Sequence, residues 1–257
     1  MIKMALHMFG YDLRAFVRNR QSQFFALALP VLFLVIFASV FGGGHTTPVA
    51  GGRISASVYY VPGVIALGVI AACFGNLVAS VTAQRERGVL KRRRATPVPA
   101  AALIAGRVLT AVVIAVVMAA VLLCIGWAAY GAHVPGRTAP ALAVTVVIGA
   151  ACFCCLGYAL ASFIRNEDAA VPTAQALLLP LYFISGVFVA VTVLPHWLAG
   201  AGEIFPVRHL ANALLTAYNP HTTGLGFAGR DLLIVTAWGA AGLLIAVRTF
   251  SWLPLGR

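Results

Sequence analysis

The chain has 257 residues, 61% of them hydrophobic and only 9% charged, and its mean hydropathy is +0.97. Soluble domains carry about 25% charged residues, so this composition excludes a soluble protein, and the long apolar blocks predict an all-α membrane protein. The net charge of +12 would suit nucleic acid, but the basic residues stand in short segments between apolar runs. The positive-inside rule explains this placement, so no nucleic-acid partner is expected.

A helix is predicted over residues 2–20. Its apolar side chains recur at spacings of three and four residues, which is typical of an amphipathic helix. The other face carries Lys3, His7, Arg14 and Arg18. A basic amphipathic helix directly before an apolar run is expected to lie in the cytoplasmic headgroup layer of the membrane. The alternative is a short soluble helix that docks on a partner.

Six apolar runs follow, and each predicts a membrane-spanning helix. Proline residues at Pro30, Pro172 and Pro180 indicate kinks in the first and fifth runs. The sixth run is short, but Arg230 and Arg248 at its ends can reach the headgroups. The runs lie within residues 21–44, 54–84, 108–136, 138–164, 169–202 and 232–247.

The basic residues orient these spans. With the N-terminus in the cytoplasm, 14 of the 18 Lys and Arg residues fall in cytoplasmic segments. The four on the outer side are Arg53, Arg137, Arg208 and Arg230. Short loops with an excess of basic residues stay inside. We therefore expect a multi-pass protein of the bacterial inner membrane, surrounded by its lipids, with both termini cytoplasmic.

Catalytic residues are hard to find in this sequence. The chain has two lysines, Lys3 and Lys91, and neither follows a glycine, which excludes a phosphate-binding Gly-x-x-x-x-Gly-Lys loop. No acid falls in the middle of a predicted span, whereas ion-driven carriers usually need a polar site there. The chain is therefore not expected to be an enzyme, and energy for transport would come from another subunit.

Metal binding is not expected either. His196 and His209 are interpreted as hydrogen-bonding residues, with a metal or haem ligand as the alternative. The cysteines lie in apolar runs and are interpreted as small packing residues, with a soft-metal site at 152–155 as the alternative. The five cysteines are Cys73, Cys124, Cys152, Cys154 and Cys155.

Two segments fit neither a span nor a simple loop. Residues 84–99 are strongly basic yet contain Glu86, a break at Gly88 and the helix start Thr96-Pro97. This favours a short helix parallel to the membrane that offers charges to a cytoplasmic partner, with a mere topology anchor as the alternative. Residues 194–219 are too polar for a span and too apolar for a free loop. They favour a re-entrant or surface-lying helical hairpin on the outer face, and carry Pro195, Trp197, Glu203 and Pro206.

The motifs of these segments carry a resemblance. Their order and membrane side resemble the type-2 permease subunits of ABC exporters, in particular the drug-resistance branch. Val89 stands where the family usually has Thr, Arg93 where Leu is common, and Phe205 in place of the Asn of an Asn-Pro pair. The matching motifs are Arg85-Glu86-Arg87-Gly88, Thr96-Pro97, Gly106-Arg107, Ser185-Gly186, Pro195, Trp197 and Pro206.

The resemblance implies a single transmembrane permease domain over residues 1–257. It implies a dimer with a second permease copy or a paralogue, joined to two copies of a separate ABC ATPase. That ATPase would bind ATP and Mg, and no cofactor is expected in this chain. The loop 84–99 would couple ATP hydrolysis to transport through Arg85, Glu86, Arg87, Gly88, Arg92, Thr96 and Pro97.

The substrate path is predicted from small, polar and aromatic side chains. Gly68, Ala72, Asn76 and Ser80 form a stripe at four-residue spacing, which fits close helix packing or a path lining. Further candidates for the path are Tyr182, Phe183, Ser185 and Phe188. The resemblance and this lining indicate export of a hydrophobic or amphipathic compound, most of all drug efflux. The alternatives are lipid or glycolipid export, a secondary multidrug carrier without an ATPase, a membrane-embedded enzyme and a structural subunit.

Overall fold

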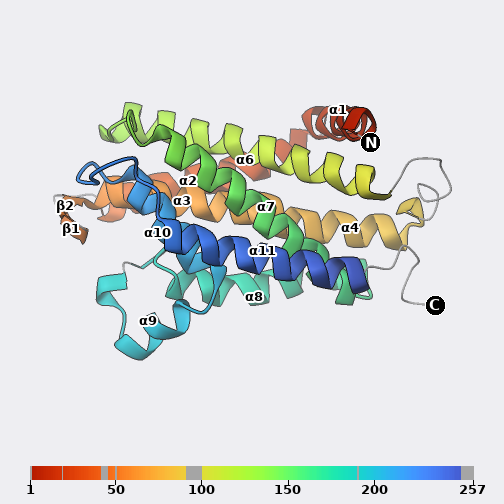
Figure 1. Ribbon diagram of the computed structural model, residues 1–257. Helices are drawn as coiled ribbons and strands as arrows, with labels where there is room; N and C mark the ends of the chain where they lie inside the picture. Colours follow the sequence, from red (N-terminus) through yellow and green to blue (C-terminus); the bar gives the residue numbers. More distant parts are fainter. Residues whose placement is uncertain are drawn as a thin grey trace.

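The chain folds into long helices that run along one axis (Figure 1). The computed structural model describes residues 2–18, 20–41, 46–49, 51–90, 100–189 and 191–249. Within these ranges every element is helical except one antiparallel β-hairpin, so the predicted all-α class is confirmed. The elements are α1 (Ile2–Arg18), α2 (Arg20–Phe41), β1 (Thr46–Val49), β2 (Gly52–Ser55), α3 (Ala56–Ile70), η1 (Ala71–Gly75), α4 (Asn76–Glu86), α6 (Ala100–Tyr130), α7 (Ala139–Phe163), η2 (Glu167–Ala169), α8 (Ala170–Ile184), η3 (Val191–Val193), α9 (His196–Gly202), α10 (Pro206–Tyr218) and α11 (Gly229–Thr249).

Four helices in the described ranges are long and apolar enough to cross a membrane. They correspond to the second, third, fourth and sixth predicted runs, so the chain is a multi-pass membrane protein. The last of them, α11, has 21 residues and is about 31 Å long at 1.5 Å per residue, which makes it longer than the predicted run. The four spans lie within Val58–Glu86, Ile104–Tyr130, Ala139–Phe163 and Gly229–Thr249.

The helix of the fifth run is shorter than predicted, whereas the helix of the first run agrees with its prediction. Helix α2 has 22 residues and covers the predicted centre of the first run, residues 24–41. Helix α8 has 15 residues and is about 22 Å long, less than a hydrocarbon core of about 30 Å. It ends at Ile184, just before Gly186, whose φ of +85° is a conformation that favours glycine. The predicted run 169–202 is therefore divided by a turn into α8 and α9.

A π-helical turn interrupts the second span. Residues Ala71–Gly75 form η1 between α3 and α4, so the span continues from 56 to 86 with one wide turn near its middle. Inside this turn, the Cys73 thiol donates a hydrogen bond of 3.7 Å to the backbone oxygen of Ala111 in α6. Such wide turns contain one more residue than an α-turn and often mark functional sites in helices.

Small residues bring α11 close to α7. A Cβ atom added at Gly242 would lie 3.0 Å from the backbone nitrogen of Leu156, and one at Gly239 would lie 3.1 Å from the Cα of Cys152. Helices in membranes associate through close backbone approach of this kind. Cys152 therefore serves in packing between spans, as its position in an apolar run indicates.

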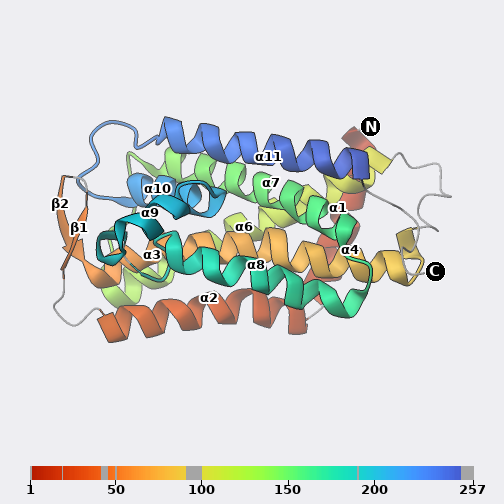
Figure 2. The same cartoon turned by 90° about the horizontal axis from the view of Figure 1, so that it is seen from below.

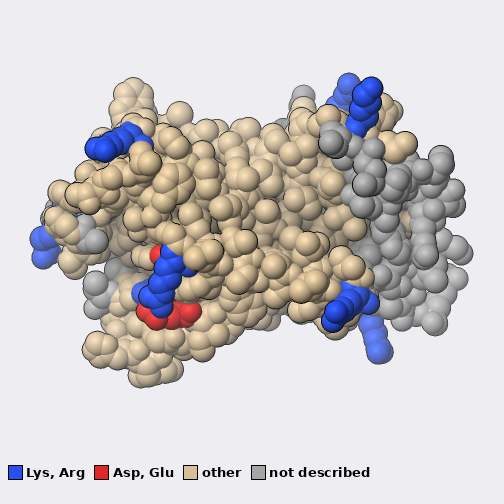
Figure 3. Space-filling view, in the orientation of Figure 1, with Lys and Arg blue, Asp and Glu red and all other residues tan. Residues whose placement is uncertain are grey.

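The two ends of the bundle differ in construction. Helix α1 lies across the other helices at one end, which we call the α1 end (Figures 1 and 2). The β1–β2 hairpin, which leads directly into α3, lies at the opposite end, which we call the β end. In the face shown in Figure 3, charged side chains lie toward these two ends and leave an uncharged band between them. This distribution suits a bundle whose middle lies in lipid.

Candidate functional site

The candidate coupling region begins where α4 ends at the α1 end. Arg87 caps the helix, and Gly88 follows with a φ of +69°. The backbone nitrogen of Gly88 donates to the oxygen of Arg85 at 3.1 Å, which closes the last turn. The helix break predicted at Gly88 is thus confirmed. Arg92, Thr96 and Pro97 lie outside the described residues.

Arg85 is turned into the protein rather than toward a partner. Its side chain is 1% exposed, although it carries a charge. The Nη1 atom donates a hydrogen bond of 2.7 Å to the oxygen of Ala161, and Nη2 donates to the oxygen of Ile164. Both oxygens belong to the C-terminal end of α7, whose last carbonyls lack helical partners. Arg85 therefore fixes the end of α4 to the end of α7, and a cation there suits the helix dipole.

Glu86 and Arg87 bind the connection between α7 and α8. The Glu86 carboxylate accepts a hydrogen bond of 2.5 Å from the backbone nitrogen of Glu167. The Arg87 guanidinium donates through Nε to the Glu167 carboxylate at 3.2 Å and through Nη2 at 3.4 Å. Glu167 is the first residue of η2, which leads directly into α8. Residues 86–87 are thus linked to the start of α8 through Glu167.

A cavity of about 280 Å³ lies beneath α1. We call it the α1 cavity; it is lined by α1, by the second span from η1 onward, and by α6. Three members of the predicted stripe, Ala72, Asn76 and Ser80, line it. The fourth, Gly68, packs instead on α6, where an added Cβ would meet Met118 at 2.4 Å. Gly68 therefore serves in close helix packing, whereas the other three residues of the stripe line the cavity.

The α1 cavity combines polar and apolar walls. Arg107 of α6 donates a hydrogen bond of 2.8 Å from Nη1 to the side-chain oxygen of Gln84, and both residues line the cavity. Asp12 of α1 lines the same space, as do the apolar side chains Phe16 and Ile114. Such a lining can hold a molecule that has both a polar and an apolar part.

The predicted aromatic candidates lie together near the end of α8. Phe188 packs on Tyr182 at a ring-centroid distance of 5.5 Å and on Phe183 at 5.2 Å. It also packs on Phe33 and Phe37 of α2, each at 5.5 Å. Tyr182 is buried, whereas Phe183 is 51% exposed. This aromatic cluster joins α2 to the turn after α8.

The segment 194–219 forms two helices separated by a short turn. Pro195 precedes α9, Glu203 caps its C-terminal end, and Pro206 is buried in the first turn of α10. Trp197 on α9 is 74% exposed. Ser185 ends α8 and is 1% exposed.

His209 joins α10 to the start of α11. Its Nε2 atom lies 2.8 Å from the backbone oxygen of Glu203, which can only accept, so Nε2 carries a hydrogen. Its Nδ1 atom lies 2.6 Å from an oxygen of the Asp231 carboxylate. The other Asp231 oxygen accepts a hydrogen bond of 2.6 Å from the Asn212 side chain. This leaves His209 no free ring nitrogen for a metal or haem.

Several contributors were missed by the interpretation of the sequence. Glu167 is 80 residues from Arg87, and no local pattern signals their pairing. The spacing of Phe33 and Phe37, one helical turn apart, was the only signal for the aromatic cluster on α2. Among the described residues, no three His, Cys, Asp or Glu side chains gather closely enough to hold a metal ion.

Comparison with known families identifies the chain. The family model described as ABC-2 type transporter matches residues 6–218, which include most of α1, the coupling region and the two helices α9 and α10. The comparison with curated proteins gave no match. Because the matched range covers most of the chain, the protein belongs to the ABC-2 type transporter family and is a membrane-spanning permease subunit of an ABC transporter.

Proposed function

We propose that this permease is part of an ATP-driven exporter that works as a dimer with two separate ATPase subunits. In this proposal α2 and α8 also cross the membrane, and α9 and α10 form a re-entrant hairpin on the outer face. Both termini lie in the cytoplasm of a bacterial cell, and α1 lies in the inner headgroup layer. The observation that carries the proposal is the charged contact between residues 86–87 and Glu167, because it offers a route for force from a cytoplasmic motor into α8.

The geometry of the α1 end supports this route. The buried Arg85 anchors the end of α4 on α7, so the residues beyond it cannot move independently of the span. Glu86 and Arg87 lie at the surface just after this anchor, where an ATPase can reach them. A push on the loop 84–99 would then move α4 and α8 together.

Glu86→Ala tests the coupling route. The variant loses the hydrogen bond to the Glu167 backbone, so we expect drug transport and transport-stimulated ATPase activity to fall at least about tenfold while assembly persists. The measurement uses the permease and its ATPase together in proteoliposomes. The matched control is Asp168→Ala, which removes an exposed acid from the same connection. Transport and stimulated ATPase at wild-type levels in Glu86→Ala would refute the coupling role.

The α1 cavity supports an amphipathic cargo. Its 280 Å³ lie near the lower limit of about 300 Å³ for pockets that bind drug-sized molecules, and its lining is mixed. We propose efflux of a hydrophobic or amphipathic drug from the inner leaflet, past Asn76 and Ser80 toward the aromatic cluster. Transport of a panel of drugs and of fluorescent lipids and glycolipids separates drug from lipid export. Transport without any ATPase would instead identify a secondary carrier.

A further inference from the structure

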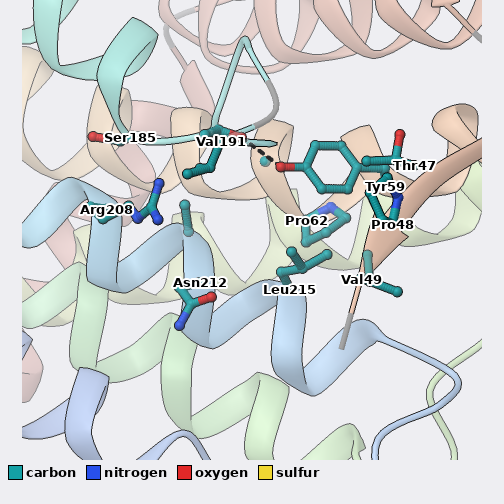
Figure 4. Close-up of a pocket in the computed structure, with 13 residues that line it drawn as sticks. Thr47, Pro48, Val49, Tyr59, Pro62, Ser185, Val191, Arg208, Asn212 and Leu215 are labelled. Atoms are coloured by element: carbon teal, nitrogen blue, oxygen red, sulfur yellow. Dashed lines mark hydrogen bonds between the residues drawn. The ribbon is translucent and has the colours of Figure 1, made fainter. Parts of the chain in front are cut away.

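A second, smaller pocket lies at the β end. It measures about 140 Å³ and is enclosed by β1, the start of α3, the turn after α8, and α10. We call it the Arg208 pocket, because Arg208 extends from α10 toward the turn that carries Ser185 and Val191 (Figure 4). Its volume is well below the roughly 300–1,000 Å³ of pockets that bind drug-sized ligands, so it fits a single chemical group rather than a whole drug.

Two buried hydrogen-bond donors in this pocket have no partner in the described structure. They are the Oγ of Ser185 and the Nη1 of Arg208, and both residues line the pocket. The buried hydroxyls of Thr82, Thr145 and Ser162 each donate to the carbonyl four residues earlier. The buried Tyr218 hydroxyl, which does not line this pocket, also has no partner among the described residues. Ser185 lacks such a bond, although it ends a helix. A buried donor without a partner is costly, so these two atoms point to an acceptor that binds from outside the chain.

The charge in the Arg208 pocket is not neutralised by the described residues. The nearby carboxylate of Asp231 is occupied by His209 on one oxygen and by Asn212 on the other. Arg208 forms no ion pair with any described acid. It also lies in the first turn of α10, where the helix dipole adds positive charge and no acidic residue offsets it. The pocket therefore favours an anion.

Tyr59 supplies a third polar group of the Arg208 pocket, close to Gly186. A Cβ atom added at Gly186 would lie 3.8 Å from the Tyr59 hydroxyl and 3.9 Å from Nη1 of Arg208, so both groups face the turn after α8. The Tyr59 hydroxyl donates only a long hydrogen bond of 3.5 Å, to the backbone oxygen of Gly186. A stronger acceptor within the pocket can take this donor over.

The level of the pocket indicates where its ligand comes from. The apolar span of the second run begins at Val58, and Tyr59 follows immediately. Tyrosines at the end of a span lie at the boundary between hydrocarbon and headgroups, which is where lipid phosphates lie. The apolar walls at Pro62, Val191 and Leu215 suit the glycerol side of such a group.

We infer that the Arg208 pocket binds a phosphate group, held by Arg208, Ser185 and Tyr59. An oxyanion of this size accepts several hydrogen bonds at once, and arginine is the side chain best suited to it. The phosphate belongs to a lipid headgroup at the membrane boundary or is free in solution. The site is distinct from the coupling region and from the α1 cavity, which lie at the opposite end of the bundle.

The test measures phosphate binding to the full-length chain in maltoside micelles, a detergent that contains no phosphate. Native mass spectrometry counts bound phosphatidylglycerol, and a parallel titration uses inorganic phosphate alone. We expect one phosphate group bound per wild-type chain. Arg208→Gln should weaken binding about tenfold or more, because it removes a charged donor, while Arg208→Lys should retain most of it. The matched control is Arg137→Gln, an exposed arginine near the start of α7 that does not line the pocket.

Ser185→Ala keeps the test valid if Arg208→Gln fails to fold. It removes a hydroxyl that has no partner, so the phosphate-free protein should melt no earlier than the wild type, yet phosphate binding should weaken several-fold. Equal binding by wild type, Arg208→Gln and Ser185→Ala overturns the inference, as does an equal loss in Arg137→Gln. Lipid binding that inorganic phosphate does not displace identifies a headgroup site, and displacement identifies a general oxyanion site. The assay uses neither the ATPase nor a cargo, so its failure leaves the proposed export function untouched.

Discussion

The α1 end and the β end differ in whether their buried hydrogen-bond donors have partners. At the α1 end, the guanidinium of Arg85 is fully buried and hydrogen-bonded to two carbonyls at the end of α7. At the β end, Nη1 of Arg208 and Oγ of Ser185 are buried and have no partner in the described structure. Buried donors that are all hydrogen-bonded hold the helices around them in one arrangement. Buried donors without a partner favour the binding of a ligand that can accept their hydrogen bonds. The contact of Arg85 with α7 is therefore expected to be a rigid joint between two helices, and the Arg208 pocket a binding site.

The largest expected effect tests the rigid joint. Arg85→Ala leaves two carbonyls at the end of α7 without their donor and opens space where the side chain was. We expect a loss of about 2–4 kcal/mol in the free energy of unfolding, measured by denaturant titration in micelles. Arg87→Ala is the matched control, since its ion pair with Glu167 is exposed and should contribute about 1 kcal/mol or less. Equal losses in the two variants would contradict a special role for the buried arginine.

The next effect tests how tightly the β end is built. Gly186 and Gly224 have nearly the same φ, +85° and +84°, but only Gly186 is crowded, with Val191 2.8 Å from an added Cβ. Gly224→Ala should cost about 1 kcal/mol for its backbone conformation alone. Gly186→Ala should cost about 1–3 kcal/mol more, because the new methyl group must displace the turn. Thermal melts of both variants measure the difference. Equal melting temperatures would show that the turn after α8 accommodates the added methyl group without a loss of stability.

The smallest effect concerns a histidine near the start of α7. His133 stacks on Tyr218 with a ring-centroid distance of 4.8 Å, and burial lowers the pKa of His133 below its usual 6.5. Because the folded protein favours the neutral imidazole, this contribution to stability is present above about pH 6.5 and is lost as the pH falls through the lowered folded-state pKa. The stability of the wild type should therefore decline faster with acidity than that of His133→Gln. Parallel pH dependence in the two proteins would exclude this contribution.

Hydropathy predicted the long spans because a bilayer imposes length and apolarity directly on the sequence. The predicted run 138–164 and helix α7, Ala139–Phe163, agree within a residue at each end. The helical nature of residues 194–219 could also be inferred, and α9 and α10 lie there. Composition alone was enough for these features, because each depends on one segment and its surroundings.

Features that depend on contacts between distant segments could not be predicted. Arg85 and Arg87 stand two residues apart in one basic cluster, yet one is buried against α7 and the other is 69% exposed. The sequence shows the cluster but not which side chain points inward. The short β-hairpin was missed because Thr46–Val49 and Gly52–Ser55 are too short to show a clear alternation. The π-turn at Ala71–Gly75 was missed because one added residue leaves an apolar run unchanged.

That wide turn gives the second span a form of freedom that a regular helix lacks. Successive residues of an α-helix are separated by about 100° of rotation and 1.5 Å of rise. If the extra residue of η1 moved along the span, the residues it passed would rotate by about 100° while both ends of the span stayed in place. Asn76 and Ser80 directly follow this turn and line the α1 cavity. A shift of this π-turn along the span would therefore change which side chains face the α1 cavity without changing the length of the span.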